Sequence, residues 1–142
     1  MRPLRVVLDT DVFISALRSE KGASYQILRL VGKGFFHTYL SVSLLLEYEA
    51  VANRYLDELA VDEGSLNGLL DYLCQVARPQ EIHFRWRPAV RDPGDEMVLE
   101  LAVAGNCDAI ITFNKRDYRG AERFGVRILS PAEFLRELGL AR

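Results

Sequence analysis

An apolar run that ends at an acid, Leu4-Arg5-Val6-Val7-Leu8-Asp9, constrains the fold of this chain more than any other feature of its sequence. A short run rich in β-branched residues that gives way to helical spacing at Val12 is typical of a buried parallel strand followed by a helix. Asp9 then lies at the carboxyl end of the strand. Because ligands bind along that edge in open α/β sheets, we expect Asp9 to face a crevice.

Strand-like and helix-like segments alternate along the rest of the chain. Further strands are expected at residues 35–40, 81–86, 109–112 and 126–129, and helices at residues 12–17, 22–31, 42–54, 63–77 and 131–138. An acidic turn at residues 91–96 is expected to open one more helix, which runs to residue 104. Ser41 and Ser130 are suited to be N-caps, and Pro131 is suited to the first helical position. This alternation predicts an α/β domain whose parallel sheet is covered by helices on both faces.

The composition suits one globular domain over residues 1–142, because 49% of the residues are hydrophobic and 27% are charged. No apolar run approaches the roughly 18 residues of a membrane helix, and no signal-peptide core is visible, so we expect a cytoplasmic protein with no membrane partner. Cys74 and Cys107 form no metal-binding motif. Cys74 continues the apolar stripe of Leu66 and Leu70 and is expected to be a buried thiol.

Four acids follow the expected strands. Asp9 ends the first strand, Glu47 lies within two turns of the start of the helix at 42–54, Asp95 lies in the first turn of its helix, and Asp117 follows the strand at 109–112. The strand-to-helix junctions of a parallel sheet share one edge, so Asp9, Glu47 and Asp117 are expected to meet in one crevice, and Asp95 joins them if its helix starts at that edge.

Helix phase supports an inward position for two of these acids. Glu47 has Leu44 and Val51 as its neighbours on the helix and no Lys or Arg three or four residues away, whereas Glu49 faces the polar side. Asp95 shares a stripe with Val98, Leu99 and Ala102. Each acid also has an ordinary explanation: Asp9 and Asp11 as helix caps, Asp95 as a first-turn acid, and Asp117 as a surface ion-pair partner. The joint pattern favours a site.

Clustered carboxylates with no His or Cys among them indicate a hard divalent cation, Mg²⁺ or Mn²⁺. Such an ion neutralises the mutual repulsion of the acids and suits phosphoryl chemistry. The net charge of −2 excludes a polycation that coats nucleic acid. Fifteen of the 18 basic residues are nevertheless Arg, and Lys115, Arg116 and Arg119 lie close to Asp117, so these three are expected to hold a substrate backbone.

Five blocks of the sequence, taken in order, resemble those of PIN-domain proteins, in particular the toxin branch of toxin–antitoxin pairs. The blocks are Asp9-Thr10-Asp11-Val12-Phe13-Ile14-Ser15-Ala16-Leu17, Ser43-Leu44-Leu45-Leu46-Glu47, Asp92-Pro93-Gly94-Asp95, Ile111-Thr112-Phe113-Asn114-Lys115-Arg116-Asp117-Tyr118 and Ile128-Leu129-Ser130-Pro131-Ala132-Glu133-Phe134-Leu135.

The resemblance implies a three-layer α/β/α fold around a parallel sheet of about five strands and a Mg²⁺- or Mn²⁺-dependent ribonuclease. Asp9, Glu47 and Asp95 match the three principal acids of the family, and Asp117 matches the fourth. Thr112 and Asn114 match small polar residues that support the metal site. Asp11 stands where Asn is frequent, and Gly94 stands where an acid is frequent; either Asn114 or Asp117 is the residue nearer the metal. The resemblance also implies an RNA substrate, a cognate antitoxin and homodimerisation.

Two alternatives remain at this stage. Asp9-x-Asp11 after a strand imitates the nucleophile and acid of haloacid-dehalogenase-type phosphatases, although the bulky Val12 and Phe13 replace the small residues that would approach a phosphate. A catalytically idle protein- or nucleic-acid-binding module that keeps the acids as scaffold is the alternative outside enzymes.

Overall fold

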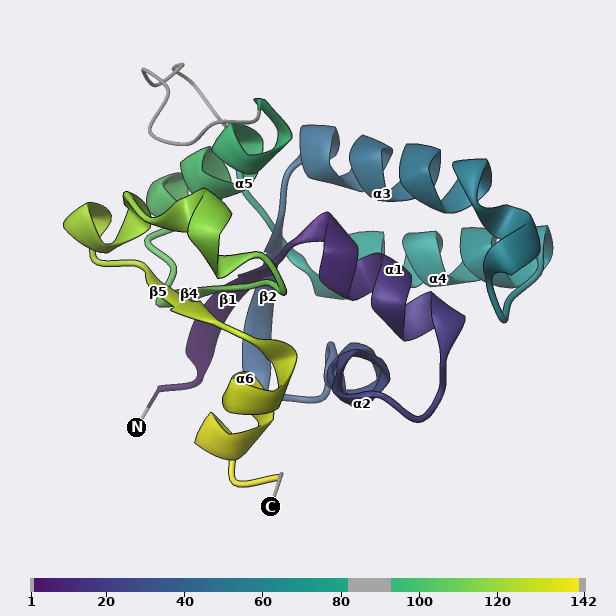
Figure 1. Cartoon of the computed structure of the whole chain (residues 1–142), viewed down its shortest axis with the longest axis horizontal. Coiled ribbons are helices and arrows are strands. Elements are labelled where there is room, and N and C mark those ends of the chain that lie inside the picture. The colour runs from purple at the N-terminus through teal and green to yellow at the C-terminus, as the bar shows by residue number, and fades with distance from the viewer. Residues whose placement is uncertain (1, 82–92, 141–142) are drawn as a thin grey trace.

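The computed structural model describes residues 2–81 and 93–140 (Figure 1). Five parallel strands form one sheet in the order β3-β2-β1-β4-β5. The strands are β1 (Leu4–Leu8), β2 (Phe36–Leu40), β3 (Arg78–Pro79), β4 (Ala109–Ile111) and β5 (Arg127–Leu129). Val6, Val7 and Leu8 of the central strand are at most 2% exposed, as expected for a strand with helices on both faces. The predicted parallel sheet of about five strands is confirmed.

Helices cover both faces of this sheet. They are α1 (Thr10–Arg18), α2 (Ala23–Leu30), α3 (Val42–Arg54), α4 (Glu63–Val76), α5 (Pro93–Ala104) and α6 (Pro131–Glu137), with the 3₁₀ helices η1 (Leu56–Glu58), η2 (Lys115–Tyr118) and η3 (Ala121–Phe124). α2 packs beside α1 and α6, whereas α5 contacts β1, β2 and β4 (Figure 1). Right-handed crossovers between parallel strands place α1 and α2 on one face and α5 on the other. The three-layer α/β/α fold is therefore confirmed.

The third strand begins earlier than the sequence predicts. Arg78 and Pro79 pair with Tyr39 and Leu40 at the edge of the sheet, whereas Glu81, the first residue of the predicted strand at 81–86, is not in a strand. Residues 82–86 of that prediction lie outside the described part of the chain. A proline is accommodated at this position because an edge strand does not need every backbone N–H in a ladder.

Helix starts follow the capping signals of the sequence. The Ser41 hydroxyl accepts from the Leu44 amide at 3.1 Å, and Ser130 caps α6 with Pro131 at the first helical position, as predicted. The predicted burial of Cys74 is wrong: Leu66, Leu70 and Leu73 of α4 are buried, but Cys74 is exposed. None of the helices in the described ranges is long and apolar enough to cross a membrane.

Candidate active site

Asp9 lies at the carboxyl end of the central strand, between β1 and α1. Its backbone amide donates to the Ile111 carbonyl at 2.9 Å, which continues the pairing of β1 with β4 past the last strand residue. Its Oδ1 accepts from the Thr10 amide at 2.8 Å, and its Oδ2 accepts from the Thr112 hydroxyl at 2.8 Å. The side chain is only 6% exposed, and this burial raises the pKa of the carboxyl despite these hydrogen bonds. Asp9 therefore caps α1 through Thr10 and also binds Thr112 in the segment that follows β4.

Asp11 holds the chain that leaves β4. Its Oδ2 accepts from the Phe113 amide at 3.1 Å and from the Asn114 side-chain amide at 2.9 Å, and it lies 3.3 Å from the Thr112 hydroxyl. Its Oδ1 is buried and has no hydrogen-bond partner among the described residues. Burial, followed by the negative charge of Asp9, raises the pKa of Asp11 to about 6. A buried carboxylate oxygen is thus left with unused capacity to bind a cation.

Glu47 reaches the same place from α3. The Thr10 hydroxyl donates to its Oε2, so the first residue of α1 fixes the orientation of this half-buried carboxylate. The charge of Glu47 contributes to the raised pKa of Asp9, which shows that the two carboxyls are electrostatic neighbours. Glu49, two residues later, is exposed. The structure therefore separates these two acids in the way that helix phase predicts.

Tyr48 joins α3 to the end of β1. Its hydroxyl donates to the Leu8 carbonyl, and its ring stacks on Phe13 with 4.4 Å between centroids and 9° between planes. Burial raises its pKa well above the usual range, and the charges of Asp9, Glu47 and Asp11 add to this effect. The phenol therefore stays neutral and fastens the helix that carries Glu47 to the strand that carries Asp9.

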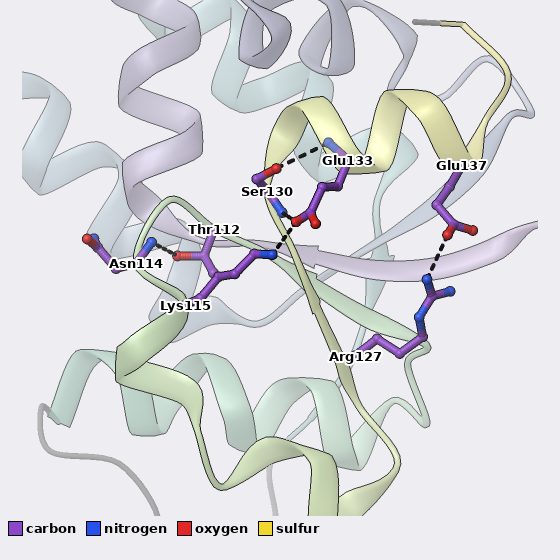
Figure 2. A network of polar contacts seen from close by, with 7 residues as sticks. All are labelled: Thr112, Asn114, Lys115, Arg127, Ser130, Glu133 and Glu137. Atoms are coloured by element: carbon purple, nitrogen blue, oxygen red, sulfur yellow. Dashed lines mark hydrogen bonds and ion pairs between the residues drawn. The ribbon is translucent and has the colours of Figure 1, made fainter. Parts of the chain in front are cut away.

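The segment after β4 is tied both to the acids and to α6. The Thr112 hydroxyl accepts from the Asn114 amide at 3.0 Å, and Lys115 forms an ion pair with Glu133 (Figure 2). Glu133 also accepts from the Ser130 amide in a capping box, and its contacts with Lys115 and Ser130 lower its pKa to about 2. Lys115, expected to bind substrate, is thus engaged within the protein. Arg116 and Arg119 are exposed and contact none of the described acids of the site.

Asp117 and Asp95 are less closely connected to this group. Asp117 lies half-buried in η2, and within the described ranges none of the hydroxyl or amide groups that donate to Asp9, Asp11 or Glu47 also donates to its carboxylate. Asp95 lies in the first turn of α5, as predicted, but its side chain lies outside the described part of the structure. α5 contacts both α3 and η2, which carry Glu47 and Asp117. The Asn114 amide, in contrast, touches Asp11 directly.

The described acids at the end of the central strand supply some, but not all, of the ligands that a divalent cation needs. Asp9, Asp11 and Glu47 have no Lys or Arg partner in the described ranges. Burial is the main cause of the raised pKa values of Asp9 and Asp11, and the charge of a neighbouring acid adds to each. Oxygen-only ligands of this kind suit Mg²⁺ or Mn²⁺. Within residues 2–81 and 93–140, no three acidic, His or Cys side chains yet converge as a complete metal site. The Asp95 carboxylate lies outside the described side chains.

Comparison with known proteins agrees with this geometry. A family model described as PIN domain matches residues 5–116, which contain Asp9, Glu47 and Asp95. The chain belongs to the PIN-domain family. Among solved structures, it is similar to a chain of "VapBC2 from Rickettsia felis bound to a DNA fragment from their promoter", with a TM-score of 0.60, 13% identity, and coverage of 89% of this chain and 98% of that one. No curated protein matches the sequence.

Three residues of this PIN domain were not singled out from the sequence. Thr10 orients Glu47, Tyr48 fastens α3 to β1, and the buried Tyr118 hydrogen-bonds to Asp9 and lowers its pKa. The sequence carries only weak signals for them, since a hydroxyl beside an acid and two tyrosines in apolar surroundings are common in ordinary cores. The family assignment also removes the support for a haloacid-dehalogenase-type phosphatase.

Proposed function

We propose that this PIN domain is a metal-dependent ribonuclease that hydrolyses RNA phosphodiester bonds, with one or two Mg²⁺ or Mn²⁺ ions held by Asp9, Glu47, Asp95 and Asp117. The observation that carries the proposal is the group formed by Asp9, Asp11 and Glu47 at the end of the central strand, because these acids are drawn together without a Lys or Arg partner among the described residues. A fold tolerates such repulsion where a divalent ion neutralises it.

The protein's own contribution is to orient the carboxylates. The Thr112 hydroxyl and the Thr10 amide each bind one oxygen of Asp9, and the Thr10 hydroxyl fixes Glu47, so both acids are held before any ligand arrives. A bound Mg²⁺ or Mn²⁺ ion supplies polarisation of the phosphodiester and activation of a water for attack. No Ser or Thr has a His beside it to act as a base in this group, which speaks against a covalent intermediate on a hydroxyl.

RNA cleavage with active-site variants tests this proposal. Purified protein is incubated with single-stranded RNA and Mn²⁺, beside Asp9→Asn, Glu47→Gln, Asp95→Asn and Asp117→Asn, with Glu49→Gln as the control on the same helix as Glu47. We expect cleavage by the wild type and by Glu49→Gln, and a loss of at least about 100-fold in the Asp9 and Glu47 variants, because the ion loses a ligand. Equal cleavage by all variants would remove this site from the reaction. No cleavage by any of them, including the wild type, would favour an idle binding module.

We also propose a cognate antitoxin as partner and a homodimer as the assembled form. The support is the sequence resemblance to the toxin branch of the family and the similarity in fold to a chain of the VapBC2 complex, which was solved as a complex on promoter DNA. Co-expression with the protein encoded by the neighbouring reading frame, followed by size-exclusion chromatography with light scattering, tests both parts. A monomer that does not co-purify with that protein would contradict them.

A further inference from the structure

A groove leads away from the acids along α1. It has a volume of about 450 Å³, and α1 lines it with Thr10, Asp11, Ile14 and Arg18. Residues at this spacing lie on one face of a helix, so the groove follows the helix from its N-terminal acids to its C-terminal arginine. With a rise of about 1.5 Å per residue, Arg18 lies about 10 Å along the axis from Asp11. The groove therefore joins an acidic end to a basic end.

α3 contributes Val51 to the opposite wall of the groove. α1 and α3 are in contact, and Val51 of α3 lines the groove one turn after Glu47. Arg54 follows three residues after Val51 and shares its face of the helix. Arg18 thus lines the groove at the end of α1, and Arg54 lies at the corresponding end of α3.

The two arginines meet at one aromatic ring. The guanidinium carbon of Arg18 lies 5.8 Å from the centroid of the Tyr55 ring, and that of Arg54 lies 6.0 Å from the same centroid. Neither arginine forms an ion pair with a carboxylate in the described ranges. Two guanidinium groups beside one ring, neither of them paired with a carboxylate in the described part of the chain, attract a polyanion. At the other end of the groove, Phe113 lines the wall and is 52% exposed.

From this arrangement we propose that the groove between α1 and α3 binds the segment of single-stranded RNA next to the scissile phosphate. Arg18 and Arg54 hold backbone phosphates, and the exposed ring of Phe113 stacks on a base. The inference rests on the proposed ribonuclease function and names its substrate track. Arg18 and Arg54 take the place of Lys115 as phosphate contacts, because Lys115 is paired with Glu133. An unpaired, sequence-tolerant strand is the ligand that combines phosphate contacts with access to the face of a base.

Salt-dependent binding separates this role from a structural one. Fluorescence anisotropy with a labelled single-stranded RNA is measured in an Asp9→Asn background, which prevents turnover, over a range of salt concentrations. Each phosphate contact contributes about 0.7 to the slope of log K against log salt for single strands. We expect Arg18→Gln with Arg54→Gln to weaken binding and to reduce the slope by about 1.4, and the two Lys variants to restore most of the slope. Phe113→Leu should raise Kd roughly tenfold without changing the slope.

Arg29→Gln is the matched control. Arg29 is also in the last turn of its helix, and its guanidinium carbon lies 5.8 Å from the Tyr25 ring, but it does not line this groove. If the Arg18 and Arg54 variants behave like Arg29→Gln while the wild type cleaves RNA with Mn²⁺, the groove proposal is wrong and the ribonuclease proposal stands. If RNA binding depends on the two arginines but the wild type cleaves no RNA, the groove binds RNA and the ribonuclease proposal is wrong. Equal dependence for single-stranded DNA would show that the track reads backbone charge and not the 2′-hydroxyl.

Discussion

The negative charge of Asp11 lowers the stability of the folded protein at neutral pH. Its Oδ2 accepts from two donors after β4, but its Oδ1 is buried without a described partner, and its pKa is about 6 against 3.8 for the ordinary side chain. Because the pKa is raised in the folded state, the contribution of the protonated Asp11 carboxyl to folding stability is fully present below pH 3.8. It is lost as the pH rises through 6.

Asp11→Asn should therefore stabilise the metal-free protein at neutral pH. In EDTA at pH 7, we expect a gain on the order of 1 kcal/mol in the free energy of unfolding, after allowance for the partial exposure of the side chain. At pH 4 the gain should vanish, because Asp11 is then mostly protonated in the folded state. Urea denaturation at both pH values measures this. Glu49→Gln, an exposed acid, is the control, and a gain of equal size at both pH values would contradict the argument.

Residues of the site differ in how far the sequence could reveal them. The sequence predicts Asp9 as a site residue because a strand ends there, and Glu47 because an acid with apolar neighbours on a helix requires an explanation. Thr10 and Tyr118 gave no such signal, since their hydrogen bonds to Glu47 and Asp9 join segments that only the folded chain brings together. Lys115 is expected to contact substrate because it lies in a basic cluster close to Asp117, and its ion pair with Glu133 could not be foreseen because Glu133 lies on another element.

The secondary-structure elements show where local chemistry is sufficient. The N-caps Ser41 and Ser130 set the starts of α3 and α6, and both were predicted. β3 was placed too late because Arg78 and Pro79 have little intrinsic preference for a strand and pair only where the end of α4 delivers them beside β2. Cys74 was misplaced for a related reason: it lies at the margin of the apolar stripe of α4, where helix phase alone does not decide exposure.

The capping box of α6 should be a measurable part of the fold. Ser130→Ala removes the acceptor of the Glu133 amide, and we expect it to lower the free energy of unfolding by about 1 kcal/mol. Ser43→Ala, at an exposed position in the first turn of α3, should change it by less than about 0.5 kcal/mol. Thermal and urea denaturation of the three proteins provide the comparison. Equal stability of the Ser130 and Ser43 variants would show that the box does not stabilise the helix.

At the scale of the whole molecule, the sheet brings distant segments to one edge. β1, β2 and β4 are neighbours, so the chain that follows each of them supplies Asp9, Glu47, and Thr112 with Asn114, although these residues are up to 105 positions apart in the sequence. Any ligand that binds these groups together must stabilise the folded state as a whole, because the unfolded chain cannot assemble them.

Metal binding should therefore appear as a shift in the melting temperature. At a Mn²⁺ concentration about 100 times its Kd, the folded state gains about 2.7 kcal/mol, which corresponds to a rise of roughly 5–10 °C for a domain of this size. Asp9→Asn and Glu47→Gln should each lose most of this rise, whereas Asp71→Asn, at an exposed position of α4, should keep it. Differential scanning fluorimetry with and without EDTA measures the shift. If the melting temperatures of all four proteins rise alike, Mn²⁺ binds elsewhere. If only the wild type and Asp71→Asn respond, the acids at the end of the central strand act as one ligand set. The bound ion then offsets the electrostatic repulsion between the gathered carboxylates.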